Sequence, residues 1–478
     1  MLGLHKLLEF RSQPGRGRAR GRAVLVSAAL GSILVVTGVS PALGQAVGTS
    51  GLNANQESMY LAIRDPANPA QSLCPRLGAK PDRTRDEEAL FVRCGRIVFA
   101  TDAGQQSDAL QQVTAEELNA ATTNSIDFSR AQRSSIAGRL IALRGGFGGA
   151  TVASNWGTGG LLTESTGGAS GDEEGSGRLG FFVNGAYGSG DKDLTDYEAA
   201  YDFDLQGVTA GLDFRFTDSF VAGAAIGYSE SSADYDGGGS LDSDGVAGSL
   251  FASLYGDKYY LDLIVGYGSP DFESARHVSY TVTRTGVNAG TDNIDHTAQG
   301  STSGDTFSAG LSAGYGFGDG ALRWGPAIAV SYVKAEVDGY AETSTCDPVD
   351  PNCHQELNLL YGDQSAESLQ FQLGLEISYV ESTPWGVASP YARVFYVAET
   401  ESDRDSFYLW YVSDPFRTAA TQANVVSDEP DTTFWVWNVG MSTAFANGFS
   451  GFIDYESVAD LDTISYGEVT LGMRYEFR

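Results

Sequence analysis

The sequence is poor in basic residues. Its 478 residues include 30 Lys and Arg against 61 Asp and Glu, so the formal net charge at pH 7 is −31. This surplus excludes nucleic acid as the obvious partner and indicates a solvated, acidic surface or lumen. Beyond the N-terminal segment, the chain also lacks any run of about 18 apolar residues, which excludes a helical membrane protein.

Cysteine is scarce, and no C-x-x-C pair occurs, so neither zinc nor redox chemistry is indicated. The four cysteines are Cys74, Cys94, Cys346 and Cys353. An even number in an exported chain indicates disulfides. Three connectivities are possible, and the local one, Cys74–Cys94 with Cys346–Cys353, is the most economical.

Histidine is equally scarce. After the N-terminal segment the chain has only His277, His296 and His354, all in predicted long loops. No nucleophile elbow and no EF-hand spacing accompany them. We therefore expect no enzyme activity, no catalytic residues, no cofactor and no metal site. A hydrolase that acts through these loops is kept as an alternative.

The first 44 residues have the features of a signal peptide. A basic stretch that ends at Arg22 precedes an apolar stretch over 23–39. Ala42 and Gly44 place small residues at the −3 and −1 positions of a cleavage site before Gln45. A membrane anchor is the alternative, but Pro41 and the small residues favour cleavage. The sequence therefore predicts a signal peptide over 1–44 and export of the remainder.

Three segments precede the strands. Residues 45–104 are predicted to form a small helical module, with Cys74 and Cys94 as its staple and helices over 53–64 and 86–98. Residues 105–146 are predicted to be a helical linker and lumen plug, with a T-x-x-E capping box at 114–117 and a second helix over 125–144. Residues 147–177 form a Gly/Ser-rich linker.

From residue 178 to the end, apolar and polar residues alternate with period 2 in one segment after another. The closing segment, YGEVTLGMRYEFR, carries this alternation to the last residues. The predicted strands cover 178–188, 203–216, 219–231, 243–256, 259–273, 304–317, 321–337, 366–381, 385–399, 432–445, 449–457 and 466–478.

The connections between these strands alternate in length. Tight turns at 217–219, 256–258, 318–320, 382–384 and 446–448 alternate with predicted long loops at 189–202, 232–242, 274–303, 338–365, 400–431 and 458–465. Short turns on one rim and long loops on the other are typical of an outer-membrane barrel, whereas a soluble sandwich has no reason to segregate them. The predicted fold class is therefore mainly β, a 12-stranded antiparallel transmembrane β-barrel over 178–478.

The alternation also assigns faces. Phe220, Ala222, Ala224, Ile226 and Tyr228 are predicted to face lipid, and so are Leu369, Phe371, Leu373, Leu375, Ile377 and Tyr379. Trp435 and Trp437 are predicted to lie in an interfacial aromatic girdle. One segment changes phase between Leu205 and Val208, and a bulge near Gln206-Gly207 would explain the change.

The inward faces carry charge, and so does the helix before the linker. That helix carries Arg130, Arg133, Arg139 and Arg144, and the predicted lumen carries Glu376, Arg393, Glu399, Asp454, Glu456, Glu468, Arg474 and Glu476. A helix of about 30 Å matches the thickness of a bilayer core. We therefore predict that the helix lies in the lumen and pairs with these carboxylates. The alternative is that the lumen charges pair with one another.

The order of these segments resembles the autotransporters of type V secretion. The stretches that carry the resemblance are GFFVNGAYG (180–188), GVTAGLDFRFTDSFVAGAAIGYS (207–229), SLQFQLGLEIS (368–378), GFIDYES (451–457) and VTLGMRYEF (469–477), with ALQQVTAEELNA (109–120) and SRAQRSSIAGRLIALR (129–144) similar to the family's linker.

The resemblance implies a barrel in the outer membrane of a Gram-negative bacterium, inserted by the barrel assembly machinery with periplasmic chaperones. It implies that Tyr475 and Phe477 form the insertion signal. It also implies export of the N-terminal residues through the lumen. Three features depart from the family: the chain ends on Arg478, residues 45–104 make a short passenger without repeats, and Asn124-Ser125 replaces the asparagine pair of self-cleaving members.

The sequence therefore predicts a monomeric outer-membrane translocator that anchors, and exports, its own short N-terminal segment. Its partners would be outer-membrane lipid and the assembly factors, and no nucleic acid. The alternative is a plugged, non-secreting barrel whose N-terminal module stays in the periplasm.

Overall fold

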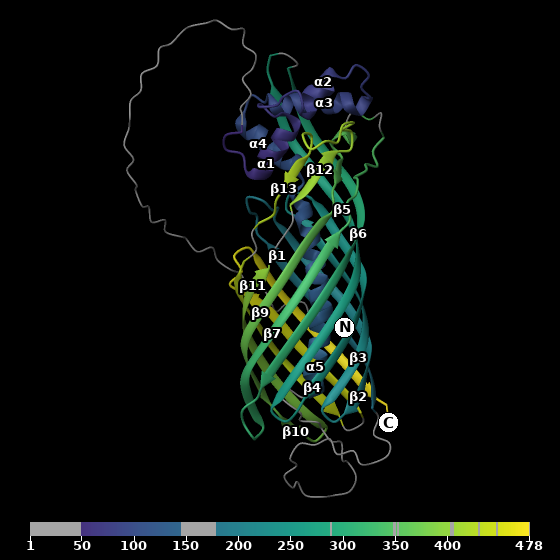
Figure 1. The fold of residues 1–478 in the computed structure, drawn as a ribbon, viewed down its shortest axis with the longest axis vertical. Helices are drawn as coiled ribbons and strands as arrows, with labels where there is room; N and C mark the ends of the chain where they lie inside the picture. The colour runs from purple at the N-terminus through teal and green to yellow at the C-terminus, as the bar shows by residue number, and fades with distance from the viewer. Residues whose placement is uncertain are drawn as a thin grey trace, which may run out of the picture. The chain divides into compact units, whose positions relative to one another are not determined.

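The computed structural model describes residues 49–144, 178–286, 289–347, 350, 353–401, 406–428, 431–445 and 448–477, all within the compact unit Gly44–Arg478. The predicted signal peptide, the 147–177 linker and Arg478 lie outside the described residues. The α-helices are α1 (Ala54–Ile63), α2 (Leu73–Ala79), α3 (Arg85–Val98), α4 (Ala103–Thr114) and α5 (Asn119–Arg144), with a 3₁₀ turn η1 (Glu116–Leu118) before α5 (Figure 1). Among the described residues, no helix is both long and apolar enough to cross a membrane.

Twelve strands close into an antiparallel β-barrel, as predicted. The last strand pairs with the first, so no edge of the barrel is left open. The strands are β1 (Leu179–Lys192), β2 (Tyr201–Thr217), β3 (Phe220–Tyr235), β4 (Gly239–Tyr255), β5 (Tyr259–Arg284), β6 (Gly290–Tyr315), β7 (Leu322–Val337), β9 (Gln364–Tyr379), β11 (Gly386–Glu401), β14 (Thr433–Phe445), β15 (Phe449–Ala459) and β16 (Ile464–Glu476), with β10 (Glu381–Thr383) paired to the start of β11.

The two rims of the barrel differ. Because the number of strands is even, Leu179 and Glu476 lie at the same rim, which also holds the tight β2–β3 and β4–β5 turns; we call it the short-turn rim. The opposite rim, the long-loop rim, carries the connections β7–β9 and β11–β14. Parts of these connections form a small second sheet, β13-β12-β8, from β8 (Leu359–Tyr361), β12 (Phe407–Tyr411) and β13 (Ala423–Val425).

The prediction of long loops at 232–242 and 274–303 is wrong, because most of these residues lie in strands. Strands β3 and β4 continue to a turn after Tyr235, and β5 and β6 continue as a hairpin to Arg284 and Gly290. The alternation reverses in these extensions, where Val278, Tyr280 and Val282 point inward and are buried. The pattern used to recognise the strands, with apolar residues facing outward, is therefore absent here, although these residues also form strands.

The predicted bulge at Gln206-Gly207 is wrong for the same reason. Strand β2 pairs with β1 and β3 without interruption at these residues. Phe203 and Leu205 point into the barrel, and Val208 and Leu212 point out of it. The surroundings change along the strand while its geometry stays regular.

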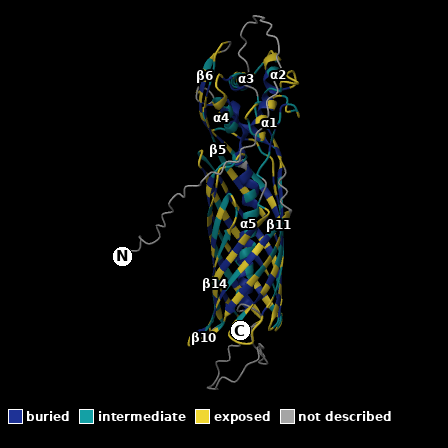
Figure 2. Ribbon diagram, turned by 90° about the vertical axis from the view of Figure 1, so that its left-hand side faces the viewer, coloured by how far each residue is buried: buried dark blue, intermediate teal, exposed yellow. Residues whose placement is uncertain are grey.

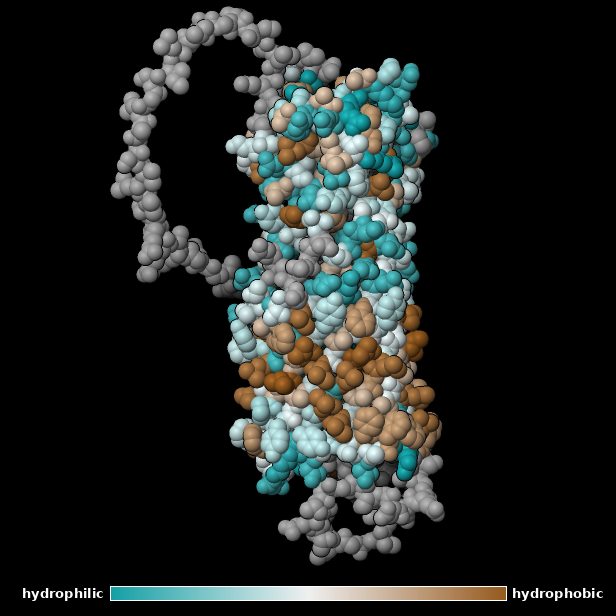
Figure 3. Space-filling model, viewed as in Figure 1, coloured by the Kyte–Doolittle hydropathy of each residue, from teal (hydrophilic) through white to brown (hydrophobic). Residues whose placement is uncertain are grey.

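The exterior of the barrel consequently has two zones. On the face shown in Figure 3, apolar residues cover the half nearer the short-turn rim, which we call the apolar belt, and a polar surface lies beyond it. Exposed and buried residues alternate along the strands in the belt (Figure 2), as predicted for the two strands over 219–231 and 366–381. Exposed side chains of the belt include Ile226, Leu250, Leu373, Leu471 and Met473, and those of the polar zone include Asp202, Asp204, Glu230, Asp242, Asp271 and Glu273.

Residues 49–118, which we call the cap, pack on the long-loop rim. One hydrophobic core joins the cap to the β5–β6 hairpin and to the small sheet. The cap contributes Met59, Ile63, Leu90 and Leu110, the hairpin Val278 and Ile294, and the small sheet Leu359, Leu409 and Val425. The cap therefore shares its core with the barrel's own loops.

The cap helices begin and end for identifiable reasons. Asn53 and Thr84 form capping boxes at the starts of α1 and α3. The capping box predicted at Thr114 is wrong, because Thr114 ends α4 and its hydroxyl donates to Leu110 O. Ala115 then adopts a left-handed conformation, with φ of 57°, which turns the chain toward the barrel. Helix α2 was not predicted.

Both predicted disulfides are present, Cys74–Cys94 between α2 and α3 and Cys346–Cys353 in the β7–β9 connection.

Candidate functional site

Helix α5 lies in the barrel lumen and contacts strands around the whole barrel (Figure 1). Asn119 at its start donates to Tyr197 O in the β1–β2 connection, at the long-loop rim. Arg144 at its end bonds Asp262, three residues after the start of β5 at the short-turn rim. The helix therefore runs from the long-loop rim toward the short-turn rim.

Small residues give the helix room. A Cβ on Gly227 of β3 would collide with the Gln132 amide, and a Cβ on Gly268 of β5 would lie 2.5 Å from Phe128. On the helix itself, a Cβ on Gly138 would lie 2.9 Å from Phe452. Helix and wall are thus in close contact at several depths, because glycine permits close backbone approach.

Three of the four helix arginines make ion pairs with the wall. Arg130 Nη2 lies 3.0 Å from Glu456, Arg139 Nη2 lies 2.7 Å from Asp213, and Arg144 pairs with Asp262. The Arg139 and Asp213 side chains are 2% and 0% exposed, so their attraction is poorly screened. Arg133 differs, because it makes no ion pair with a carboxylate among the described residues.

The lumen carboxylates predicted from the sequence did not include Asp213 and Asp262. Both lie between outward apolar residues, Leu212 and Phe214 in one case and Leu261 and Leu263 in the other, so the alternation alone points them inward. Asp213 also accepts from Arg474 Nη2 at 2.8 Å, and Arg474 in turn pairs with Glu476 at 2.6 Å.

The other predicted lumen carboxylates mainly bond the wall itself. Glu468 accepts from Ser134 of α5 at 3.1 Å, which is a hydrogen bond and not an ion pair. Glu376 accepts from Tyr260 at 2.8 Å, Glu399 from Ser368 at 3.0 Å and Gln370 at 2.9 Å, and Asp454 from Tyr391 at 2.7 Å and Asn438 at 3.0 Å, with Arg393 at 3.6 Å. Apart from Asp454 with Arg393, these contacts are hydrogen bonds from uncharged side chains and not pairs of lumen charges.

The cap seals two open strand edges with side chains. Along β5, beyond its pairing with β4, Ser279 N donates to Gln112 Oε1 and Thr283 N donates to Gln105 Oε1, each at 3.0 Å. Both glutamines lie on α4. They take the place that a neighbouring strand would occupy.

The edge of β13 is sealed from α1 in the same way. Asn55 Oδ1 accepts from Val426 N at 2.8 Å, Asn55 Nδ2 donates to Val426 O at 2.9 Å, and Ser58 accepts from Asn424 N at 2.7 Å. Asn55 Nδ2 also lies 3.0 Å from Glu116 Oε1. Burial raises the pKa of Glu116 to about 7, although hydrogen bonds from Asn55 and Gln111 oppose the shift.

Residues 181–456 of the chain match the model of the autotransporter beta-domain. The chain belongs to the autotransporter family. The barrel is accordingly an outer-membrane translocator barrel of a Gram-negative bacterium, and assembly of such barrels depends on the barrel assembly machinery.

The curated relative that the chain matches is distant in sequence. Outer membrane protein B of Rickettsia prowazekii (strain Madrid E) is 23% identical over 336 residues, which cover 69% of this chain and 20% of that protein. The chain thus spans about a fifth of the length of this curated relative.

Among solved structures, the translocator domain of autotransporter NalP from Neisseria meningitidis is similar with a TM-score of 0.47 and 16% identity, covering 64% of this chain and 90% of that one. The beta domain of the Bordetella autotransporter BrkA gives a TM-score of 0.41 and 19% identity, covering 63% and 100%.

The aromatic residues at the end of the autotransporter barrel face outward. Tyr475 and Phe477 are exposed in the apolar belt, and their rings meet edge to face at 5.3 Å. Trp435 and Trp437 are also exposed, on β14, in contact with Tyr396 and Tyr455.

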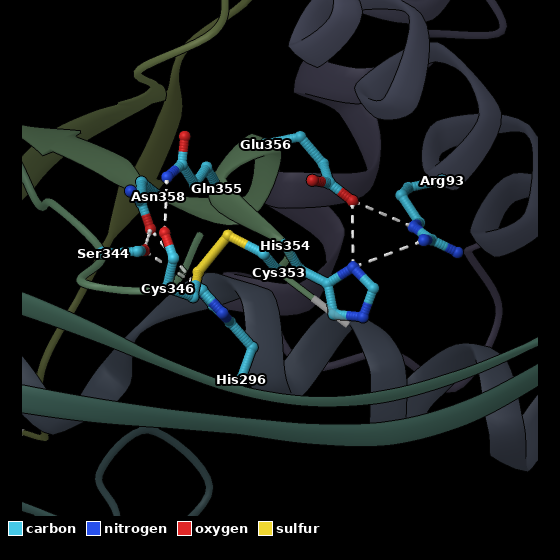
Figure 4. The surroundings of a disulfide bond; sticks show 9 residues. All are labelled: Arg93, His296, Ser344, Cys346, Cys353, His354, Gln355, Glu356 and Asn358. Atoms are coloured by element: carbon cyan, nitrogen blue, oxygen red, sulfur yellow. Dashed lines mark hydrogen bonds and ion pairs between the residues drawn. A yellow bond between two sulfur atoms is a disulfide. The ribbon is translucent and has the colours of Figure 1, made fainter. Parts of the chain in front are cut away.

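The prediction that all three histidines lie in loops is wrong. His277 and His296 lie on β5 and β6, and only His354 lies in a connection. His296 belongs to a hydrogen-bonded triangle (Figure 4), in which Ser344 Oγ lies 2.8 Å from Asn358 Oδ1 and 3.1 Å from His296 Nε2, with Nε2 3.3 Å from Asn358 Oδ1. The Ser344 hydroxyl has one proton, which either Asn358 Oδ1 or an unprotonated His296 Nε2 can accept.

Proposed function

We propose that this autotransporter carries its own residues 49–118 through the barrel and keeps them on the cell surface as the cap. The observation that carries the proposal is the direction of α5. The helix enters the lumen from the long-loop rim, so every described residue before it belongs to that rim. In outer-membrane barrels the short turns are periplasmic and the long loops are extracellular.

The ends of the barrel support the same direction. Leu179 and Glu476 lie at the short-turn rim, on the periplasmic side in this orientation. The cap lies on the other side and shares a core with the extracellular loops. On this proposal, residues 49–118 are made inside the cell and cross the outer membrane to reach that side.

The buried ion pairs explain why α5 would stay in the lumen after export. Breaking Arg139–Asp213 or Arg144–Asp262 would leave a charge without its partner in a poorly hydrated interior. Withdrawing the helix would break both pairs together. The lumen carboxylates thus act as an anchor for the exported segment.

The two alternatives receive less support. A periplasmic N-terminal module would pack at the short-turn rim, and the cap packs at the long-loop rim. A loop hydrolase would need a nucleophile beside its base, and no nucleophile elbow accompanies the three histidines in the sequence. Replacing His277, His296 and His354 together should leave every assayed activity unchanged; a lost activity would revive that alternative.

We also propose that one chain suffices and that Tyr475 and Phe477 form the insertion signal for the assembly machinery. The barrel closes on itself through β1 and β16, so no partner chain is needed to complete the sheet. The two aromatic side chains lie outside the lumen, where a machinery protein can contact them.

An accessibility experiment tests the export proposal. One epitope is inserted at Gly51, at the start of the cap, and a matched one at Gly320, in the β6–β7 turn; both positions are open around the Cα. Protease added to intact cells should remove the first epitope and spare the second until the outer membrane is permeabilised. Protection of the Gly51 epitope in intact cells would refute export of the cap.

A further inference from the structure

A narrow cleft opens between the cap and one of the long connections of the barrel. It has a volume of about 170 Å³ and lies between helix α3 and the segment 353–356 of the β7–β9 connection. Its lining residues are Arg85, Asp86, Ala89, Arg93, Cys353, His354, Gln355 and Glu356. Because the cap supplies one wall and the connection supplies the other, the cleft exists only while the cap is docked.

The inner end of the cleft is a charge network that the protein compensates by itself. Arg93 Nε lies 3.2 Å from Glu356 Oε1 (Figure 4), and Arg93 Nη1 pairs with Asp292 of the β5–β6 hairpin. Arg96 pairs with the same Asp292. The side chains of Glu356 and Asp292 are only 4% and 1% exposed. Two arginines thus meet two buried carboxylates, and no charge is left over for a ligand.

The outer end of the cleft differs. Arg85 and Asp86 lie in the first turn of α3, Arg85 exposed and Asp86 half-buried. Neither side chain makes an ion pair or a hydrogen bond with another residue in the described part of the chain. Consecutive residues of a helix point about 100° apart, so these two side chains do not face each other. The outer end therefore presents a separate positive and negative charge.

The rest of the lining offers a small apolar wall and one further hydrogen-bonding atom. Ala89 and the disulfide-bonded Cys353 are apolar. His354 Nδ1 lies 3.3 Å from Glu356 Oε1 and 3.4 Å from Arg93 Nη2, and its Nε2 has no partner among the residues that the structure describes. The cleft can therefore hold a short apolar group beside its two charges.

We propose that this cleft binds a small zwitterion, of which a free α-amino acid is the simplest kind. The ligand's carboxylate pairs with Arg85 and its ammonium group pairs with Asp86, because guanidinium–carboxylate and ammonium–carboxylate pairs are the matching charge-assisted contacts. A short side chain lies against Ala89. One water needs about 10–15 Å³ of such space, so a ligand of several non-hydrogen atoms fits.

A ligand with a single charge matches the lining less well. An anion bound at Arg85 is repelled by the nearby Asp86 carboxylate, and a cation bound at Asp86 is repelled by the Arg85 guanidinium. A zwitterion is attracted by both groups. Its net charge is zero, so the formal charge of −31 on the whole chain does not keep it away.

Binding is coupled to docking of the cap, because the ligand needs both walls of the cleft. A ligand that binds only the docked state stabilises that state increasingly as its concentration rises above the dissociation constant. The ligand therefore slows cleavage of the cap by protease. The site does not depend on the proposed export, which decides only whether the cleft faces the medium.

Limited proteolysis of the detergent-solubilised full-length protein tests the proposal, because cleavage follows the population of the undocked cap. The probes are L-alanine, propionate and ethylamine, at equal concentration and ionic strength, up to the solubility of L-alanine. Propionate is L-alanine without its amino group, and ethylamine is L-alanine without its carboxylate. We expect L-alanine alone to slow cleavage of the cap severalfold, with saturation.

Two variants assign the effect to the cleft. In Arg85→Gln and in Asp86→Asn, the rates with and without L-alanine should be equal. Asp82→Asn is the matched control, since Asp82 is exposed and lies outside the cleft lining, and this variant should keep the protection. Protection that survives in both cleft variants would mark a general solvent effect and overturn the proposal. Equal protection by propionate or ethylamine would also overturn it, as would a rate that L-alanine leaves unchanged.

Discussion

Asn55 on helix α1 bonds the backbone of Val426 as a neighbouring β-strand would, across 371 residues of sequence. Its amide accepts from Val426 N and donates to Val426 O. One buried side chain therefore holds the first helix of the cap on the edge of a sheet built from barrel loops. This type of contact explains how helices cover strand edges without adding a strand.

Asn55→Ala should loosen the cap without unfolding the barrel. The change leaves Val426 N–H without its partner and removes one of the hydrogen bonds to Val426 O and one of those to Glu116, which costs about 1–3 kcal/mol. Hydrogen exchange at Val426 and Asn424 should accelerate. The matched control is Asn68→Ala, because Asn68 is exposed and its side chain, among the residues that the structure describes, bonds only that of Asp65. Equal exchange in the two variants would contradict the role of Asn55.

Asp213→Asn should destabilise the plugged barrel strongly. The carboxylate lies between Arg139 and Arg474, and neutralising it leaves two buried guanidinium groups poorly compensated. Removal of one partner from a buried pair typically costs about 3–5 kcal/mol. Heat-modifiable migration should show unfolding at a lower temperature. Asp202→Asn, on the outward face of the same strand, should leave the transition unchanged.

Cap stability should fall as the pH rises. The pKa of Glu116 is raised from an ordinary 4.5 to about 7, so the buried carboxyl group is favoured in its protonated form. Ionising Glu116 in the folded cap costs free energy that the unfolded chain does not pay. This cost is absent below the ordinary pKa, grows between pH 4.5 and about 7, and is complete above that range, where it amounts to at most about 3 kcal/mol. Burial also raises the pKa of Glu117, which adds to the trend in the same direction.

Proteolysis rates of the cap at about pH 5 and about pH 8 measure this effect, because the unfolded carboxylate is charged throughout that interval. We expect faster cleavage at the higher pH in the unaltered chain. In Glu116→Gln the difference should shrink. A pH dependence that Glu116→Gln leaves unchanged would assign the effect to another group.

Phe477→Ala should lower the yield of folded barrel severalfold, because it removes half of the proposed insertion signal. The amount of heat-modifiable protein in outer membranes measures this. Met473→Ala is the matched control, since Met473 is also exposed in the apolar belt of β16. A similar loss in both variants would attribute the effect to lipid contact alone. An unchanged yield in Phe477→Ala would show that Phe477 is not part of an insertion signal.

The barrel itself could be predicted from the sequence because each strand carries its own evidence. Leu373 and Leu375 face out and Gly374 and Glu376 face in, whatever the neighbouring strands do. The same period placed Glu456 and Glu468 in the lumen beside an arginine-bearing helix. Asp213 and Asp262 were within reach of this reasoning, since they alternate with outward leucines.

The hairpin of β5 and β6 could not be recognised in this way. Val278 and Val282 are apolar on the inward side because the cap covers them, and Ser279 and Thr281 are polar on the outward side, where both are exposed. Apolar and polar residues alternate with the same period whether the apolar residues face inward or outward. The alternation therefore does not say which face a distant segment of the chain will cover.

The sequence by itself determined the strand count, the apolar belt, the charged lumen and the local disulfides, because these depend on residues that are neighbours in the chain or repeat along one strand. Only the tertiary structure decided which arginine meets which carboxylate, and that residues 49–118 become a cap on the long-loop rim. Those outcomes depend on contacts such as Asn55 with Val426 and Arg139 with Asp213, which form only after distant segments have been brought together.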